Sequence, residues 1–320
     1  MDSEFQDQML DKYDVYLCSS GYEDRTCGGI QNIKNDTKFE HSFMILLELD
    51  DPRLLESNRA NAEKIRENLA RHSSVPKSVS FKPEQISEFT NFLYENTSDH
   101  QSILIDVTSF TRSFLYSILN VCIRKYLNTH LIYSEPEKYT ENYAQGLEDV
   151  IIMPSNPGIP NQSKKILLVL FLGWENIRLE SLIERWEPTK VITMIEFADD
   201  ERGDWNKKTR DNCKNIIDSY ECMEIPALNP RESLARLEGV YNRHGEEYDI
   251  CLANGGSKVH CFAISEFASR HPEVQIIYPK PYRWQQESLS KDNIIPTSSG
   301  IGETHFFKFP ICAPIEEIPV

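Results

Sequence analysis

The segment DVTSFTR, residues 106–112, gathers side chains that could bind a polar ligand. Asp106 supplies a carboxylate, Thr108 and Ser109 supply hydroxyls, and Arg112 supplies a guanidinium. The segment directly follows a short apolar run, so it is expected at the carboxyl end of a buried strand. In an open α/β sheet this is the edge at which ligands bind, near a switch point in strand order.

A purely structural role for these residues is the alternative. A helix is expected to begin around Thr111, which makes Thr108 and Ser109 candidate N-cap residues that need no ligand. The free backbone N–H groups of that helix would point at the same edge. The aspartate could hold a neighbouring loop, and Arg112 could form an ion pair with an acidic residue of the segment 19–25.

A second polar segment, SSGYEDR (residues 19–25), follows the first predicted strand and is expected at the same sheet edge. Its tyrosine could stack on a nucleobase, although an aromatic residue in a loop also commonly covers its own core. A salt bridge from Glu23 to Arg25 is the structural alternative to a ligand-binding role. The candidate ligand-binding residues of this segment are Ser19, Ser20, Tyr22, Glu23 and Arg25.

The segment NGGSKVH, residues 254–260, joins a predicted strand to a predicted helix in the second half of the chain. Its glycines permit close backbone approach, and a helix N-terminus together with Lys258 favours an anion such as phosphate. The spacing fits neither a Walker A loop nor G-x-G-x-x-G, and a tight turn that needs glycine for its geometry is the alternative. The candidate ligand-binding residues of this half are Trp174, Arg178, Asn254, Gly255, Gly256, Ser257 and Lys258.

An enzymatic role would use the same loop. His260 could act as a general acid or base, and Lys258 could stabilise developing negative charge. Glu175 is a further acid–base candidate, with a salt bridge to Arg178 as its structural alternative. A histidine on the first turn of a helix is also commonly only packed or solvated, so these catalytic roles are hypotheses.

The apolar periodicity that would position these segments alternates strands with helices. Strands separated by helices of this length indicate βαβ units and a mainly parallel sheet. In the first half the pattern predicts strands at residues 14–20, 43–49, 103–107 and 130–136, and helices at residues 57–71 and 113–127.

The pattern then repeats. Three segments of the second half match segments of the first half that lie about 150 residues earlier. They are ILLVLFLGWENIR, which matches VYLCSSGYEDR; VITMIEFADDE, which matches MILLELDD; and ICLANGGSKVHCF, which matches ILIDVTSFTRSFL. The two tails also correspond, since each has a glycine, a short strand and a proline. We therefore predict an α/β protein of two tandem Rossmann-like parallel-sheet domains related by internal duplication: residues 1–153, a Pro/Gly-rich linker at 154–165, and residues 166–320.

Composition narrows the classes of partner. The formal net charge is −16 and the isoelectric point about 5.0, which disfavours bulk nucleic-acid binding but leaves room for a small anion held by local donors. The longest strongly apolar run, residues 166–174, is too short to span a bilayer, and no secretory signal is recognisable, so we expect a cytoplasmic protein without membrane contact. None of the eight cysteines forms a C-x-x-C pair, which favours buried thiols over disulfides or zinc. No cofactor and no metal are expected.

DVTSFTR and its layout resemble the CRISPR-associated Rossmann-fold (CARF) ligand-sensing domains of bacterial antiviral defence. In that family a strand ends in a D/N-x-S/T-x-x-x-R/K signature at the ligand-binding edge, which Asp106, Thr108 and Arg112 match. The loop after the first strand, residues 19–25, supplies the other binding residues in the family.

The second half departs from this signature. Asn254 fits its first position, but Gly256 stands where a hydroxyl residue is expected and His260 where Arg or Lys is expected. Ser257 and Lys258 are offset substitutes. Two unequal halves would suit an asymmetric ligand, or one binding half and one catalytic half.

The resemblance implies a sensor or regulator in antiviral defence that binds a nucleotide, for example a cyclic oligonucleotide, across a two-fold interface. A tandem copy would build that interface between its own two halves. The two repeats occupy nearly all of residues 13–310, so an effector or partner protein of the same system is expected to carry the response. The alternatives are a nucleotide-processing enzyme that uses the NGGSKVH loop, either a ring-nuclease-like phosphodiesterase or an N-glycosidic hydrolase, and a protein-binding scaffold subunit.

Overall fold

The computed structural model describes residues 9–48, 52–72, 76–139, 145–161, 163–173, 177–197, 203–283 and 298–310. The chain forms two compact units. The first comprises Met1–Asn142 and Glu287–Phe309, and the second comprises Tyr143–Gln286 and Pro310–Val320.

The first unit is built on a six-stranded sheet in the order β14-β5-β4-β1-β2-β3. Strands β1 to β5 pair in parallel, and β14 pairs with β5 in the antiparallel direction. The central strands β1 and β4 are buried along most of their length because both faces of the sheet are covered. The bounds are β1 Lys12–Ser19, β2 Lys38–Leu47, β3 Lys77–Phe81, β4 Ser102–Asp106, β5 Asn128–Ser134 and β14 Thr304–Phe309.

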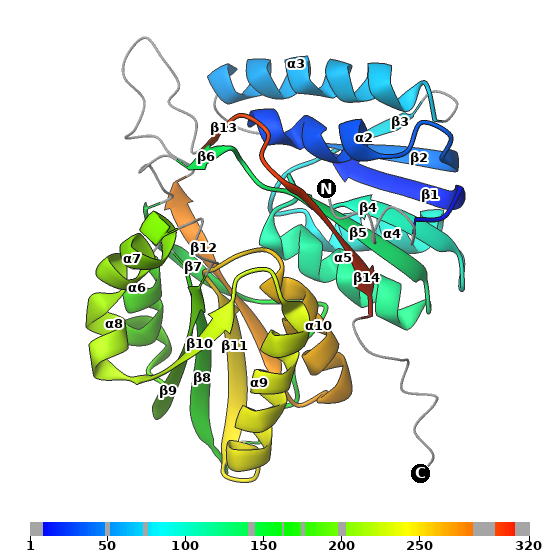
Figure 1. The fold of residues 1–320 in the computed structure, drawn as a ribbon. Coiled ribbons are helices and arrows are strands. Elements are labelled where there is room, and N and C mark those ends of the chain that lie inside the picture. Colours follow the sequence, from blue (N-terminus) through cyan, green and yellow to red (C-terminus); the bar gives the residue numbers. More distant parts are fainter. Residues whose placement is uncertain are drawn as a thin grey trace. The chain divides into compact units, whose positions relative to one another are not determined.

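Helices cover the two faces of this sheet. Helices α2 and α3 lie on one face and α4 and α5 on the other, the arrangement that right-handed crossovers produce when the chain changes direction along a sheet (Figure 1). Phe89 of α4 stacks on Phe114 of α5 at 4.3 Å between ring centroids, which joins the two helices beneath the sheet. The bounds are η1 Asp24–Cys27, α2 Gly28–Asn32, α3 Pro52–Leu69, α4 Ile86–Asn96 and α5 Arg112–Arg124. A short ribbon, β6 Lys138–Tyr139 with β13 Ser298–Ser299, belongs to the same unit.

The second unit has a six-stranded sheet in the order β10-β9-β8-β11-β12-β7. Its strands are parallel except β7, which pairs with β12 in the antiparallel direction. Helices α6, α7 and α8 lie on one face and α9 and α10 on the other (Figure 1). The bounds are β7 Gln145–Ile152, β8 Lys165–Leu172, α6 Ile177–Trp186, β9 Lys190–Phe197, α7 Gly203–Asn212, α8 Lys214–Ser219, β10 Glu221–Pro226, α9 Pro230–His244, β11 Tyr248–Asn254, α10 His260–Arg270 and β12 Gln275–Arg283.

The two sheets repeat one strand order, which confirms the predicted α/β class and its two tandem Rossmann-like repeats. Strands β1 to β5 in the first unit take the same positions as β8 to β12 in the second. In each unit the first three parallel strands run from the centre of the sheet to one edge, and the next two lie on the opposite side of the first strand. The resulting switch points lie between β1 and β4 and between β8 and β11.

The tails of the two repeats are exchanged. Strand β7 follows the first repeat in sequence but completes the second sheet, and β14 follows the second repeat but completes the first sheet. The units therefore differ from the contiguous domains predicted at residues 1–153 and 166–320. The two tails are alike in sequence, and edge pairing is decided by backbone hydrogen bonds between distant segments, which a sequence pattern does not specify.

The sequence analysis did not predict β3 and β10, which are the outer parallel strands. Both are short, and most of their side chains are exposed or half-buried, so they lack the apolar run by which the central strands are recognised. The predicted strands at β1, β2, β4 and β5 and the helices at α3 and α5 are confirmed within a few residues.

The cysteines are packing groups. The described cysteines are free thiols, and all but Cys222 are buried; Cys312 lies outside the described residues. Burial raises the pKa of Cys27 to about 11 and the pKa values of Cys122 and Cys213 to about 12. A thiol with such a pKa is almost wholly protonated near neutral pH, so these residues are poor nucleophiles.

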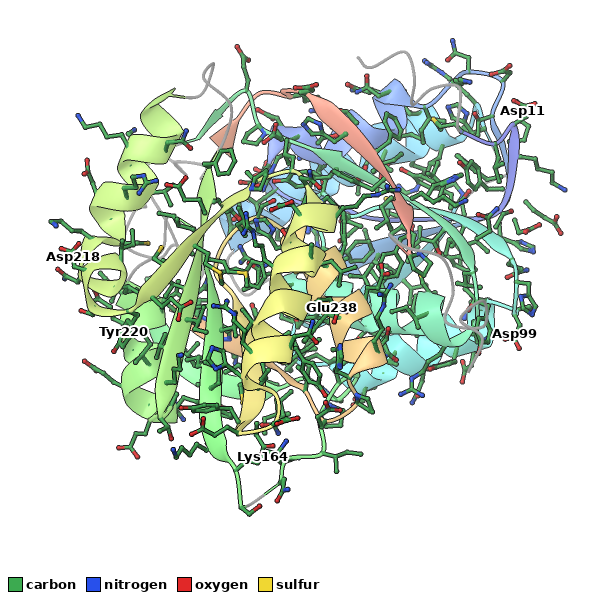
Figure 2. The ribbon with its side chains drawn as sticks, turned by 60° about the horizontal axis from the view of Figure 1, so that its bottom comes forward. Asp11, Asp99, Lys164, Asp218, Tyr220 and Glu238 are labelled. Carbon is green, nitrogen blue, oxygen red and sulfur yellow. The ribbon has the colours of Figure 1, made fainter. Side chains whose placement is uncertain are left out.

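Acidic side chains lie on the outside of each unit. Asp11 and Asp99 in the first unit and Asp218 in the second are exposed (Figure 2). Within the described residues no helix is long and apolar enough to cross a membrane.

The tail exchange predicts which sheet loses stability when the chain is shortened. A chain that ends at Ser299 lacks β14, so the backbone groups of β5 that face β14 become exposed to solvent. Amide hydrogen exchange in β5 should accelerate by about tenfold or more, equivalent to about 1.4 kcal/mol. Exchange in β12 should be unchanged, because its edge partner is β7.

A chain that ends at Pro310 retains β14 and is the matched control. Equal acceleration in β5 and β12 of the shorter chain would contradict the exchanged pairing.

Candidate functional site

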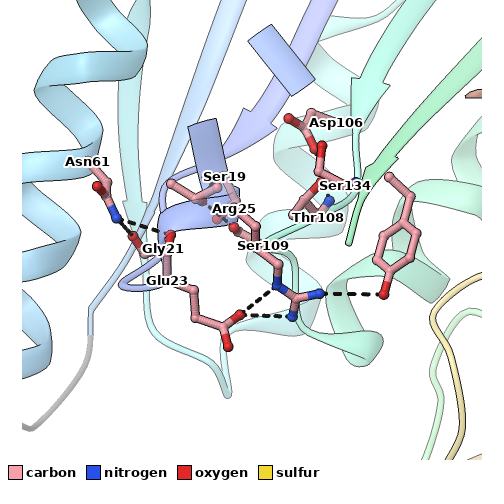
Figure 3. A network of polar contacts seen from close by, with 11 residues as sticks. Ser19, Gly21, Glu23, Arg25, Asn61, Asp106, Thr108, Ser109 and Ser134 are labelled. Carbon is pink, nitrogen blue, oxygen red and sulfur yellow. Dashed lines mark hydrogen bonds and ion pairs between the residues drawn. The ribbon is translucent and has the colours of Figure 1, made fainter. Parts of the chain in front are cut away.

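The two polar segments of the first unit meet at its switch point, as the sequence predicts. Strands β1 and β4 are neighbours in register, with Cys18 opposite Asp106, so the segments 19–25 and 106–112 leave the same sheet edge side by side. Gly21 permits the contact, because a Cβ there would lie 2.7 Å from Ser109 Oγ. Figure 3 shows the polar contacts of Glu23, Arg25 and Asn61, with Asp106, Thr108 and Ser109 of the second segment beside them.

Asp106 is buried and points into the unit. Only 3% of the residue is exposed, and its Oδ1 accepts a hydrogen bond of 3.0 Å from the backbone N–H of Thr108. Gly29 of helix α2 lies directly against the carboxylate, so that a Cβ at this position would overlap with it. Asp106 therefore shapes the turn after β4 and supports α2.

The buried hydroxyls of the edge also have structural partners. Ser19 and Ser20 donate to the carbonyl of Ile45 at 3.2 and 3.4 Å. Thr108 Oγ1 accepts from the backbone N–H of Ser134 at 3.0 Å, which ties the turn to β5.

The N-cap of α5 is Thr111, whose side chain accepts from Phe114 N at 3.3 Å. The expected capping by Thr108 or Ser109 is therefore wrong. Both residues lie too early in the turn, and their hydroxyls bond elsewhere: Thr108 to Ser134 N and Ser109 to Thr26 Oγ1.

The loop after β1 is held by ionic and amide contacts. Arg25 forms an ion pair with Glu23, with Nε and Nη2 at 2.9 and 2.8 Å from Oε2, and its Nη1 donates to Tyr133 Oη at 3.4 Å. Asn61 of α3 donates its amide to the carbonyls of Gly21 and Glu23 at 2.9 and 3.2 Å (Figure 3). The expected salt bridge between Glu23 and Arg25 is thus present.

A half-buried set of side chains remains at this edge after the buried residues are set aside. It combines an aromatic ring, a carboxylate, two guanidinium groups and a hydroxyl: Tyr22, Glu23, Arg25, Arg112 and Ser109. We call this set the first switch-point edge. Its chemistry suits an anionic ligand with an aromatic part.

The second switch point is closed by glycine packing. Strands β8 and β11 are neighbours, with Phe171 opposite Asn254. A Cβ on Gly173 would lie 2.6 Å from the carbonyl oxygen of Gly255, so backbone meets backbone there. Asn254 Oδ1 accepts from Gly256 N at 2.9 Å, which repeats the turn made by Asp106 in the first unit.

The backbone N–H groups of this loop are bonded within the protein. Gly255 N donates to Phe171 O at 2.9 Å, Ser257 N donates to the carboxylate of Glu196, and Val259 N donates to Ser257 Oγ at 3.2 Å. A phosphate that binds the backbone N–H of Ser257 would have to displace the Glu196 carboxylate, because that carboxylate already accepts from it.

His260 lies in a fully buried polar chain. Its Nε2 is 2.8 Å from Glu196 Oε1, and both side chains are 0% exposed. Its Nδ1 bonds to Ser233 Oγ at 3.0 Å, and that hydroxyl is 3.2 Å from the carbonyl of Asn229, the N-cap of α9. This chain fastens β9, α9 and α10 together.

Some of the residues predicted for the second unit are buried and do not face solvent at its switch point. Arg178 lies in α6 with 2% exposure, and His260 is 0% exposed, so neither is open to a ligand. Ser257 and Lys258 are half-buried. Trp174 and Glu175 lie outside the described residues.

The sequence analysis missed Glu196 and Ser233 as partners of His260. A carboxylate within the apolar run VITMIEF was the available signal for Glu196, since a charge in a buried strand needs a partner. Ser233 carried no signal, because serine in the first turns of a helix is common.

Comparisons with known proteins show no family. No protein-family model matches the chain, and no curated protein matches it. Among solved structures, one chain is described as the crystal structure of the cytoplasmic domain of a prokaryotic cation chloride cotransporter. The TM-score is 0.28 at 7% identity, covering 83% of this chain and 95% of that chain, a likeness too low to support any inference.

Because Gly29 packs against Asp106, adding one methyl group at position 29 should lower the stability of the protein. Gly29→Ala should destabilise the protein by about 1–3 kcal/mol in denaturant unfolding, because the Cβ overlaps the buried carboxylate. Gly239→Ala in α9 is the matched control, since a Cβ there meets nothing within 4 Å, and it should stabilise by about 0.5–1 kcal/mol. Wild-type stability in Gly29→Ala would show that the two groups are not in contact.

The buried chain at His260 predicts a second stability effect. Glu196→Gln should lower the free energy of unfolding by about 3–5 kcal/mol, because it removes one partner of a buried pair. Glu48→Gln is the control, since Glu48 holds the corresponding position after β2 and is exposed, and it should change stability by less than about 0.5 kcal/mol. Similar unfolding curves for the two variants would argue against the buried contact.

Proposed function

We propose that the protein is a ligand-binding sensor or regulator whose first switch-point edge binds a nucleotide. The observation that carries this proposal is the half-buried set of Tyr22, Glu23, Arg25, Ser109 and Arg112 at the switch point of a Rossmann-like sheet. Ligands of open α/β sheets bind in this position.

The chemistry of the edge supports a nucleotide over a simple apolar ligand. Arg112 and Arg25 can contact phosphate oxygens, Tyr22 can stack on a base, and Glu23 and Ser109 can bond to sugar hydroxyls. The overall charge of −16 repels anions, so binding would depend on these local donors. Arg25 already faces Glu23, so a phosphate would share or replace that ion pair.

The first unit supports this role better than the second. In the second unit the Glu196 carboxylate accepts from Ser257 N, and Asn254 accepts from Gly256 N. We therefore propose that nucleotide binding is asymmetric, with the first unit as the binding unit. The match of Asp106, Thr108 and Arg112 to the CARF signature supports a role in antiviral defence, with the response carried by a partner protein.

The role of Arg112 can be tested by calorimetric titration of the full chain. The titrants are mononucleotides, linear oligonucleotides and cyclic oligonucleotides. At least one should bind, and Arg112→Ala should weaken it by about tenfold or more, because a hydrogen bond to a charged group contributes about 1.5–3 kcal/mol.

Arg124→Ala is the matched control, since Arg124 is an exposed arginine at the opposite end of the same helix, with its Nε 3.1 Å from Asn120 Oδ1. It should bind as the wild type does. The proposal fails if none of the nucleotides binds, or if Arg112→Ala and Arg124→Ala bind equally well.

A further inference from the structure

Three metal-ligating side chains converge in the first unit where β14 begins and β5 ends. Glu135 directly follows β5, Glu303 directly precedes β14, and His305 is the second residue of β14. One ligand atom from each residue lies within 4.8 Å of the others. These residues belong to neither switch point.

The antiparallel pairing forces the two carboxylates together. Thr304 pairs with Ser134 and His305 with Tyr133, and the backbone N–H of Glu135 donates to the carbonyl of Glu303 at 2.8 Å. The two glutamates are therefore directly opposite each other across the strands. Like charges in this relation destabilise a sheet, so the pairing calls for a positive charge between them.

His305 faces both carboxylates. Its Nε2 lies 2.9 Å from Glu135 Oε2 and 4.0 Å from Glu303 Oε2. The Glu135 side chain is 9% exposed, the His305 side chain 17% and the Glu303 side chain 53%, so the group lies at the surface with Glu135 as its most buried member.

We propose that Glu135, Glu303 and His305 bind one divalent transition-metal ion, of the class of Zn²⁺ or Mn²⁺. One imidazole nitrogen and two carboxylate oxygens form a ligand set that these ions accept, and three protein ligands leave at least one position for water. Ligand atoms about 2.0–2.2 Å from a tetrahedral ion lie about 3.4 Å apart. The present spacings of 2.9 and 4.0 Å bracket that value, and all three ligand atoms lie within 4.8 Å of one another.

The ion would cross-link the exchanged strand to the first sheet. Its ligands come from segments 170 residues apart in sequence, and β14 reaches β5 only because of the tail exchange. The junction is already held by Ser134 Oγ and Thr304 Oγ1 at 2.9 Å, and by Asn32, which donates to Thr304 Oγ1 at 3.0 Å. The metal would add a bond of higher strength at the same point.

The experiment is a titration of the full chain, first stripped with a chelator, with Zn²⁺ and separately with Mn²⁺. Bound metal is quantified by calorimetry and by elemental analysis after gel filtration. At least one of the two ions should bind at one equivalent per chain. Glu303→Gln should weaken that binding by more than about tenfold, the loss that even an outer-shell change produces. Glu303 is 53% exposed, so this variant should fold normally.

His305→Asn should have the same effect as Glu303→Gln. His41→Ala is the matched control, because His41 faces a single carboxylate, Glu40, at 4.0 Å on an exposed surface, and it should retain the bound ion. The proposal is overturned if neither ion binds at one equivalent, or if Glu303→Gln and His305→Asn both retain wild-type affinity.

Discussion

Each sheet of this protein depends on an edge strand that comes from the tail of the other repeat. Strand β14 closes the edge of β5, and β7 closes the edge of β12. Without these strands, the outer backbone groups of two buried apolar strands would face solvent as open edges. Neither unit is contiguous in sequence for this reason, and the junction of β5 with β14 gathers polar side chains from segments about 170 residues apart.

Inside each unit, the switch point is shaped by a buried carboxylate packed against glycine. In the first unit the carboxylate is Asp106, at the end of β4, against Gly29. In the second it is Glu196, from β9, against Gly256, while Asn254 takes the place of the aspartate. The two units thus have the same strand order but use different side chains where loops approach each other closely at the sheet edge.

These two sets of side chains leave different chemistry at the surface. In the first unit the buried carboxylate and hydroxyls bond within the protein, and an aromatic residue and two arginines are half-buried at the edge. In the second unit the carboxylate of Glu196 accepts from the backbone N–H of Ser257 in the loop before α10, and His260 lies next to it. The two repeats therefore share one strand order but differ in the side chains at their switch points.

The sequence by itself determined the alternation of strands and helices, the repeat and the two polar strand ends, because these depend on local periodicity and on residue type. Tertiary structure alone decided that β7 and β14 change places, because the pairing of an edge strand depends on backbone contacts between distant segments. It also decided which polar residues are buried: Asp106 and His260, both read as ligand or catalytic candidates, lie inside the units. Tertiary structure also decided the convergence of Glu135, Glu303 and His305. No sequence motif predicts it, because these residues meet only through the pairing of the exchanged strand β14 with β5.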